Sequence, residues 1–377
     1  MTAMLEITCR DPIVSRDGRP FGVGQGNRMR SLDWLLPSVL AGSLRSTLGK
    51  TADRDFSVET AKALLRVEIA GPLPQACGQL YFPSPEDCVV DSKQRPLRAV
   101  PQAVTGGGCD WPAQGLLPVQ IQTADDFKPE AAPAWWPEDR YAAWLAGEEI
   151  AFDRTFLRAA EIEERTHVRI EPDAGSAADE NLFTTAALAL SHLPRHGASD
   201  FAPITLAVRF RAAYWCGEAA AHLDTLHPLG GERRLAHWKT SARPIAWSCP
   251  EKVRKALSAA SRVRMVLVTP GIFASGWKPG WLDEGLAGTP PGTNIRLRLV
   301  GVSIRRWRAV SGWSLADLPG QPRGPKPVKR MVPAGGVYFF ETTDGKALDL
   351  AGRWLEPVSD DEQDRRDGFG LATWGVW

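Results

Sequence analysis

The sequence lacks the features that identify several common classes of protein. No apolar run approaches the length of a membrane-spanning helix, so we expect no membrane segment. Residues 1–6 contain neither the basic nor the apolar region of a signal peptide, which predicts a cytoplasmic protein. The six cysteines form no C-x-x-C pair, which argues against zinc and favours a reducing compartment. We therefore expect neither a metal nor a cofactor.

The glycine-rich segment Gly368–Gly375 is followed only by Val376 and Trp377. Glycine loops of mononucleotide and dinucleotide sites precede a helix whose N-terminus faces the phosphate. We expect neither type of site here, because no residues remain for such a helix. The backbone amides of the loop can still approach a phosphate, and a tight turn before a C-terminal strand is an equally good interpretation.

The small net charge of +1 conceals a strong segregation of charge along the chain. Residues 227–330 contain nineteen basic and five acidic residues, whereas residues 125–181 contain fifteen acidic and six basic ones. A concentrated basic block indicates a surface for an anionic polymer, and the acidic segment suits contacts with protein. The alternative is a solvated basic face that is balanced by acidic segments of the same fold.

Alternation and helical spacing predict an α+β protein that divides near residue 200. We interpret residues 1–200 and 201–377 as two ferredoxin-like domains, of the split βαβ type found in RNA-recognition modules. A segment rich in Pro, Gly and Trp, at about 86–160, is predicted to be an insertion of loops in the first domain, outside its core. Strands are predicted at 5–10, 65–69, 79–82, 167–170, 182–190, 204–210, 263–268, 295–299 and 337–341, and helices at 37–48 and 251–261.

Seven segments together carry a resemblance to a known family. They are 16–22, 37–45, 227–234, 267–271 with 276–279, 311–314, 326–340 and 368–370. In the family's order, these segments resemble the third subunit of the Cmr module, the type III-B CRISPR effector complex, in the RAMP superfamily. The resemblance implies two ferredoxin-like domains in a prokaryotic antiviral subunit without catalytic activity. It further implies binding of the 5′ handle of the CRISPR guide RNA, and contacts with the large polymerase-like subunit and the backbone RAMP subunit.

Basic side chains and glycines of these segments and their neighbours are the candidate RNA contacts, because single-stranded RNA is held mainly through its phosphates. Phe369 and Trp374 are candidate stacking partners for bases, although a place in the core is the better interpretation for each of them. The predicted RNA-binding residues are Arg28, Arg30, Arg45, Gly230, Gly231, Arg233, Arg234, Lys239, Lys326, Lys329, Arg330, Gly368, Phe369 and Gly370.

Two other functions are compatible with the sequence. Some RAMP proteins are metal-independent ribonucleases that cut repeat RNA with histidine, and His227 and His237 flank the Gly-Gly-Glu-Arg-Arg motif. No tyrosine, serine or second histidine forms a recognisable constellation with either one. Alternatively, the chain is a purely structural subunit whose basic block meets an acidic protein.

Overall fold

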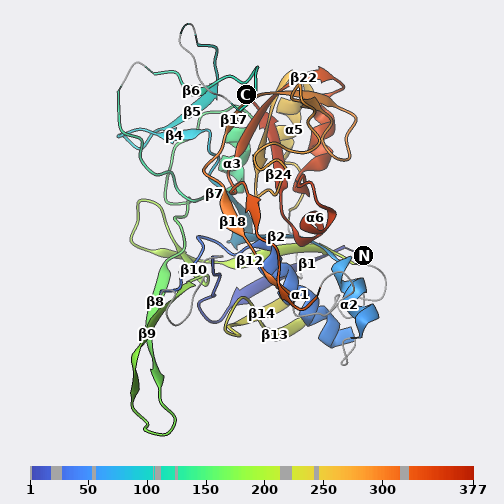
Figure 1. The fold of residues 1–377 in the computed structure, drawn as a ribbon. Coiled ribbons are helices and arrows are strands. Elements are labelled where there is room, and N and C mark those ends of the chain that lie inside the picture. Colours follow the sequence, from blue (N-terminus) through green and yellow to red (C-terminus); the bar gives the residue numbers. More distant parts are fainter. Residues whose placement is uncertain are drawn as a thin grey trace.

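The computed structural model shows a mixed α/β protein built on two antiparallel sheets (Figure 1). One sheet, with helices α1 and α2 beside it, forms the lower part of the view, and the other forms the upper part. The structure describes residues 2–17, 28–52, 57–104, 106, 112–123, 126–212, 223–241, 246–314 and 322–377.

The first sheet combines four strands from residues 1–200 with β12, β13 and β14, which lie beyond residue 200. The division between the two sheets therefore falls after residue 240, and not near residue 200 as predicted. Its order is β13-β14-β1-β12-β2-β3-β7, and every neighbouring pair is antiparallel. Helix α1 begins at Pro37, a residue suited to the first helical turn, and buries Leu40, Leu44 and Leu48, which lie four residues apart. The elements are β1 (Thr2–Cys9), α1 (Pro37–Ala52), α2 (Val58–Leu65), β2 (Glu68–Ala76), β3 (Gln79–Pro83), β7 (Trp135–Pro137), β12 (Thr205–Arg211), β13 (Asp224–Pro228) and β14 (Leu235–Thr240).

The second sheet belongs to the C-terminal half. Its order is β16-β17-β22-β15-β24-β23, again with antiparallel neighbours throughout. Its elements are α5 (Glu251–Ser258), β15 (Arg262–Leu267), β16 (Ala287–Gly288), β17 (Arg296–Ser303), β22 (Val337–Asp344), the 3-10 helix η2 (Ala347–Arg353), β23 (Glu356–Pro357), α6 (Glu362–Asp367) and β24 (Leu371–Val376).

Small ribbons extend from this two-sheet body. The longest is the β8–β9 hairpin, which projects away from the first sheet at the lower left of Figure 1. The remaining elements are β4 (Cys88–Val90), β5 (Pro96–Pro101), β6 (Val119–Ile121), α3 (Glu138–Leu145), β8 (Ile162–Ile170), β9 (Ala177–Leu188), β10 (His192–Pro194), β11 (Phe201–Pro203), β18 (Arg308–Val310), β19 (Trp313–Ser314), β20 (Gly324–Pro325) and β21 (Lys329–Met331).

Most elements predicted from periodicity are confirmed, including the helices that begin at Pro37 and Glu251. Several boundaries differ by a few residues, and two of the differences have a clear cause. Helix α1 continues through Gly49 to Ala52, because helical hydrogen bonding tolerates an isolated glycine at a modest cost. The strand predicted at residues 65–69 begins only at Glu68, because Leu65 ends the helix α2.

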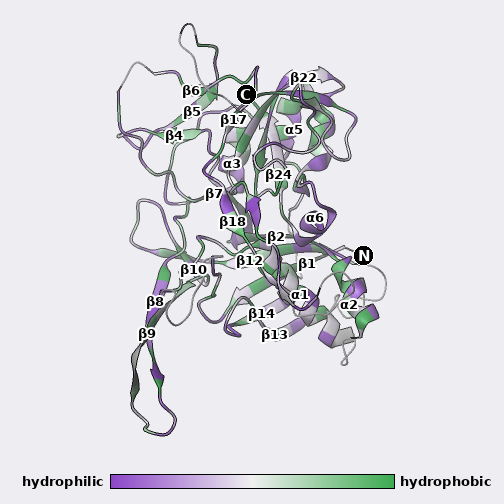
Figure 2. Ribbon diagram, viewed as in Figure 1, coloured by the Kyte–Doolittle hydropathy of each residue, from purple (hydrophilic) through white to green (hydrophobic). Residues whose placement is uncertain are grey.

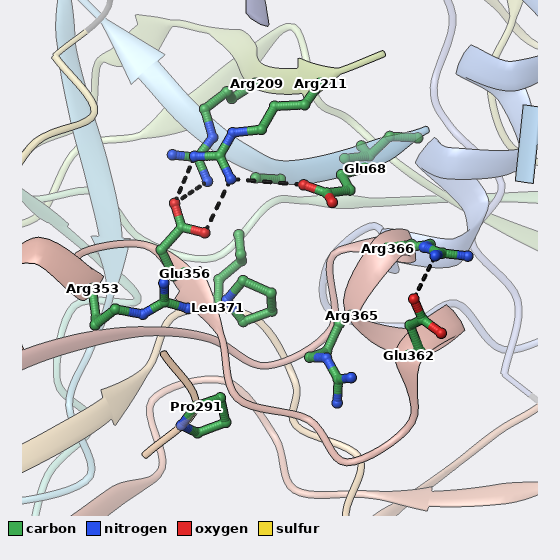
Figure 3. A pocket seen from close by; sticks show the side chains of 13 residues that line it. Glu68, Arg209, Arg211, Pro291, Arg353, Glu356, Glu362, Arg365, Arg366 and Leu371 are labelled. Carbon is green, nitrogen blue, oxygen red and sulfur yellow. Dashed lines mark hydrogen bonds and ion pairs between the residues drawn. The ribbon is translucent and has the colours of Figure 1, made fainter. Parts of the chain in front are cut away.

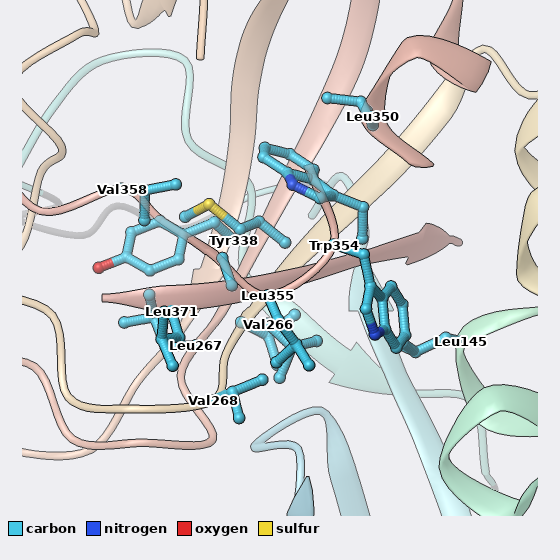
Figure 4. Packing of buried hydrophobic residues seen from close by; sticks show 14 of the residues in the cluster. Leu145, Val266, Leu267, Val268, Tyr338, Leu350, Trp354, Leu355, Val358 and Leu371 are labelled. Atoms are coloured by element: carbon cyan, nitrogen blue, oxygen red, sulfur yellow. The ribbon is translucent and has the colours of Figure 1, made fainter. Parts of the chain in front are cut away.

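The interpretation of residues 86–160 as loops outside the core is wrong for their second part. Trp136, Tyr141 and Trp144 are almost fully buried and pack in the same cluster as the strands of the second sheet. Figure 4 shows Leu145, the last residue of α3, beside side chains from β15 and the segment after η2. Aromatic side chains carry enough apolar surface to make a loop-rich segment part of a core.

A buried ion pair also attaches this segment to the second sheet. The Asp87 carboxylate accepts a hydrogen bond from Nη1 of Arg264, and both side chains are 0% exposed. Nε1 of Trp144 donates to the same carboxylate at 2.9 Å. A charge buried this deeply needs such partners, because the low-dielectric interior does not replace water.

A second buried ion pair joins the two halves. Arg45 of α1 donates from Nη1 to Oδ1 of Asp367, at the end of α6, over 2.5 Å. Its Nη2 donates to the carbonyl of Val67 at 2.9 Å. The two side chains are 10% and 8% exposed. Gly368, the next residue, has φ +94°, and a Cβ atom there would lie 2.7 Å from the carbonyl oxygen of Ile69.

Replacement of Asp367 tests this junction. We expect Asp367→Ala to lower the free energy of unfolding by about 3–5 kcal/mol, because it leaves the Arg45 guanidinium buried without its counter-ion. Glu362→Ala in the same helix removes only the pair with Arg366, in which Glu362 is 67% exposed, and should cost less than about 1 kcal/mol. Urea unfolding measures both variants, and equal losses would contradict the assignment.

Candidate nucleic-acid interface

The most basic part of the chain forms a projecting arm between β17 and β22. We call the described residues 304–314 and 322–331 the basic arm. It consists of two short antiparallel pairs, β18–β21 and β19–β20. Residues 304–331 include seven basic residues and one acid. β18 lies between the two sheets in Figure 1, and hydrophilic segments lie beside its label in Figure 2.

An apolar cluster fixes the root of the basic arm to both halves. We call this the anchor cluster. Nη2 of Arg308 also lies 2.5 Å from Oδ2 of Asp33, just before α1. The root of the arm is therefore held by both an apolar and an ionic contact. The buried members of the anchor cluster are Leu32, Leu36, Ile272, Val310, Met331 and Phe369.

Several cations of the arm have no acidic partner in the part of the chain that the structure describes. These are Arg306, Arg323, Lys326 and Arg330. The guanidinium of Arg330 lies over the ring of Trp307, 4.8 Å from its centroid. Unpaired cations at a surface keep their full attraction for an incoming phosphate.

Two other cations of the region are paired. Nζ of Lys329 lies 2.8 Å from Oδ2 of Asp364, and Nε of Arg305 lies 2.7 Å from Oε1 of Glu86. Burial raises the pKa of the Asp364 carboxyl, and the hydrogen bonds from Lys329 oppose this rise. Lys329 therefore helps to keep a half-desolvated carboxylate charged, in addition to facing the surface.

A second group of predicted residues gathers beside the loop before α1. Gly231 donates its amide to the carbonyl of Val14 at 2.9 Å, and Met29 donates to the carbonyl of Thr184 at 2.8 Å. Arg30 and Arg233 are exposed, without a carboxylate partner among the described residues. Val14, which Gly231 contacts, also packs against Met29, the residue between Arg28 and Arg30, so the structure places these arginines near the Gly230-Gly231 turn.

The loop at residues 28–33 connects the basic arm with the predicted residues around the Gly230-Gly231 turn. Arg28 and Arg30 are followed within a few residues by Leu32 and Asp33, which contact the root of the basic arm. Arg28 is exposed and forms an ion pair with Glu164 of the β8–β9 hairpin. One surface thus extends from the basic arm, along residues 28–33, to the Gly230-Gly231 turn.

The C-terminal glycine loop does not offer its backbone to a ligand. The amides of Gly368, Phe369 and Gly370 donate to the carbonyls of Arg365, Asp364 and Pro270, at 3.1, 3.0 and 2.8 Å. The tight turn before the last strand is therefore the observed conformation, and its amides are not a phosphate cradle. Phe369 is 2% exposed and Trp374 is 0% exposed, so neither ring has a face that a base can reach.

Besides Arg28 and Lys329, three more predicted cations are engaged within the protein. The Arg45 side chain is 10% exposed and forms the buried pair described above, so we do not include it in the surface. Nη2 of Arg234 lies 3.2 Å from Oε2 of Glu232, and Nζ of Lys239 lies 3.8 Å from Oδ2 of Asp224.

A cavity of about 300 Å³ lies between the halves, lined by five arginines and three glutamates (Figure 3). Its charges are largely compensated. Arg209 and Arg211 both lie within 3 Å of Oε1 of Glu356, at 2.9 and 2.8 Å. Burial acts to raise the pKa of Glu356, but the hydrogen bond from Arg211 and the nearby guanidinium of Arg209 hold it below its ordinary value. We interpret this cavity as part of the junction between the halves.

The histidines proposed for a ribonuclease lie on opposite faces of one sheet. In the β13–β14 ladder His227 is opposite Ala236, and His237 is opposite Leu226. Successive residues of a strand point to opposite faces, so the two imidazoles cannot act together on one phosphodiester. Burial also lowers the pKa of His227 below its ordinary value. Among the described residues, no group of three or more His, Cys, Asp or Glu side chains is placed to hold a metal.

Two exposed tryptophans were not singled out from the sequence. Trp307 is 47% exposed and Trp313 is 61% exposed, whereas the other tryptophans that the structure describes are buried or half-buried. Both lie within the most basic stretch of the chain. Their position among clustered basic residues is the signal in the sequence that could have singled them out. The number of tryptophans, fifteen, does not by itself separate surface residues from core residues.

Comparison with known proteins places the chain among CRISPR-associated proteins. It belongs to the Cas_Cmr3 family, whose sequence profile matches residues 5–377. This confirms the resemblance to the third Cmr subunit and makes the chain a subunit of a type III-B CRISPR effector. No protein with a curated description matches it significantly.

Solved structures of type III complexes include similar chains. One is in the cryo-EM structure of the type III-B Cmr-beta complex bound to cognate target RNA, with 12% identity, 89% of this chain and 86% of that chain covered, and a TM-score of 0.49. Another is in the crystal structure of the Csm3-Csm4 subcomplex of the type III-A interference complex, with 8% identity, coverage of 91% and 93%, and a TM-score of 0.39.

Within the described residues, no helix is both long and apolar enough to cross a membrane. Residues 18–22 of the predicted first loop lie outside the described residues.

Substitution of two glycines by alanine should have opposite effects on stability. Gly230 has φ +75°, and a Cβ atom would lie 2.6 Å from the carbonyl oxygen of Val14. We expect Gly230→Ala to cost at least about 1–2 kcal/mol, because an L-residue is strained at this φ and the turn must also move. Gly42 in α1 has nothing within 4 Å of a Cβ position, so Gly42→Ala should stabilise by up to about 1 kcal/mol. Chemical denaturation measures both, and a stabilising Gly230→Ala would contradict the turn geometry.

Proposed function

We propose that this chain is the subunit that holds the 5′ handle of the guide RNA in its type III-B effector. It binds the handle through phosphates and joins the large polymerase-like subunit to the backbone RAMP subunits. The unpaired cations of the basic arm are the observation that carries this proposal. Arg306 and Arg323 are exposed and Lys326 is half-buried, on an arm whose root contacts Leu32 and Asp33.

The layout of the halves supports this proposal. We infer two ferredoxin-like domains. In the first sheet the neighbours β14-β1-β12-β2 follow the order fourth, first, third, second along the chain. In the second sheet the neighbours β24-β15-β22-β17 follow the same order. A split βαβ unit produces this antiparallel order, and RNA-recognition modules use it.

We also propose that the subunit is not itself a nuclease. The placement of His227 and His237 on opposite faces supports this, because general acid–base cleavage needs two groups on one side of the scissile bond. Members of the Cas_Cmr3 family are generally non-catalytic. Cleavage of target RNA then belongs to neighbouring subunits.

Removal of unpaired cations should change the salt dependence of RNA binding. Each phosphate neutralised on a single strand contributes about −0.7 to the slope of log K against log salt concentration. We expect the triple variant Arg306→Ala, Arg323→Ala, Lys326→Ala to lose about 2 units of slope. Fluorescence anisotropy with a labelled 5′-handle RNA, over a series of KCl concentrations, measures this.

A matched variant controls for net charge. Arg262, Arg296 and Arg298 lie on the second sheet, and each pairs with an acid, Glu341 or Asp283. Their triple replacement by alanine removes the same charge and should leave the slope unchanged. Equal losses of slope in the two triple variants would contradict the proposal. So would crosslinking of the guide's 5′ end, in the assembled complex, to the backbone subunit alone.

The ribonuclease alternative makes a different prediction. We expect the double variant His227→Ala, His237→Ala to leave both guide length and complex assembly unchanged, because the two imidazoles do not share a site. Denaturing gels of the guide RNA co-purified with the complex measure its length. Loss of repeat-RNA cleavage in the double variant, with the complex still assembled, would favour the enzyme instead.

A further inference from the structure

The basic arm exposes two indole rings that contribute little to the core. Trp313 follows Gly312, whose carbonyl accepts a hydrogen bond from the amide of Lys326 at 2.8 Å. The Lys326 side chain passes close to Gly312, with Cδ 3.5 Å from a Cβ position there. Lys326 therefore places a cationic side chain directly after β20, the strand whose Pro325 is opposite Trp313. Leaving so much aromatic surface in water is unfavourable by about 25 cal/mol per Å².

The second ring is held in a different way. Trp307 directly precedes β18, and Arg330 on the partner strand β21 lies over it. A guanidinium is planar, so it stacks both on the indole and on a further flat group. The ring and the cation together present a stacking surface that already carries positive charge.

The root of the arm gives these rings a fixed support. Val310 and Met331, 6% and 2% exposed, lie in the anchor cluster, three residues or fewer from Trp307, Trp313 and Arg330. A ring presented on an ordered support loses less conformational freedom when it binds a ligand.

We propose that Trp307 and Trp313 are stacking platforms for unpaired bases of single-stranded RNA, with neighbouring cations on the phosphates. The inference rests on the proposed function and deepens it, because it names the part of the RNA that each side chain contacts. Stacking on an aromatic face is tolerant of base identity, since every base has a π-face. The platforms therefore add affinity for bases without reading their order.

The charges favour RNA over a protein partner. Exposed tryptophan and arginine also anchor protein interfaces, but those interfaces combine both signs of charge around an apolar centre. The described residues of the basic arm include seven cations and no acid, and four of these cations have no acidic partner among the described residues. Repulsion among these cations is relieved most directly by a chain that supplies one negative charge per nucleotide.

Binding of two probes to the full-length protein tests the inference. One probe is a single-stranded oligoadenylate, and the other is an abasic oligoribonucleotide with the same number of phosphates. We expect the double variant Trp307→Ala, Trp313→Ala to weaken oligoadenylate binding by about 5- to 150-fold for each base that loses its platform. Binding of the abasic probe, and the salt slope with either probe, should stay as in the wild type.

Two further variants keep the test independent of folding. Trp307→Phe with Trp313→Phe retains aromatic faces and should retain most of the affinity. Val328→Ala removes an exposed aliphatic side chain, 69% exposed, from the same arm and should have no effect. Unfolding curves of all the variants confirm that the body of the protein is intact.

The outcomes separate this inference from the proposed function. Wild-type affinity of the double tryptophan variant for oligoadenylate overturns the platforms, while a steep wild-type salt slope still supports RNA binding. Unchanged RNA affinity together with loss of neighbouring subunits on co-purification assigns the rings to a protein contact, and also overturns the inference. Absence of salt-dependent binding of either probe by the wild type overturns the proposed function itself.

Discussion

The ion pair between Arg45 and Asp367 is the contact on which the arrangement of the halves depends. It lies where α1 of the first half meets α6 of the second, and neither side chain reaches water appreciably. Gly368 follows at once, in a left-handed conformation that brings the backbone against β2. Phe369 then enters the anchor cluster, where it meets the loop before α1 and the root of the basic arm. Three consecutive residues, Asp367, Gly368 and Phe369, thus fix the junction, and through it the position of the candidate RNA surface.

The buried charges of this protein join segments that are far apart in sequence. Arg45 and Asp367 are one example, and Asp87 with Arg264 is another. Each guanidinium is also hydrogen-bonded to a backbone carbonyl, of Val67 in one case and of Trp144 in the other. A buried pair adds little net stability compared with apolar residues, but the loss of either partner is costly. Such pairs therefore select one arrangement of the segments, because an incorrect arrangement leaves a charge desolvated.

The sequence predicted the parts of the fold that are set by local periodicity. Alternation located strands such as β12 and β15, and four-residue spacing of leucine located α1. The role of residues 135–157 was not predictable from composition, because Pro, Gly and Trp are as common in loops as at the edges of a core. The glycine loop was ambiguous for a related reason. Whether its amides are available depends on Pro270 and other distant carbonyls, which local sequence does not reveal.

The candidate RNA surface was also predictable only in part, because a sequence reveals its basic residues but not which of them have acidic partners. Nine basic residues between Arg296 and Arg330 form a single block in the sequence. In the structure, Arg296 and Arg298 on β17 have acidic partners, whereas Arg306, Arg323 and Lys326 on the basic arm have none among the described residues. A paired cation gives up an existing contact when it binds a phosphate, so its net gain is small. An unpaired cation gives up only water and counter-ions, so in the function that we propose the affinity for RNA depends on the arm more than on the sheet that carries it.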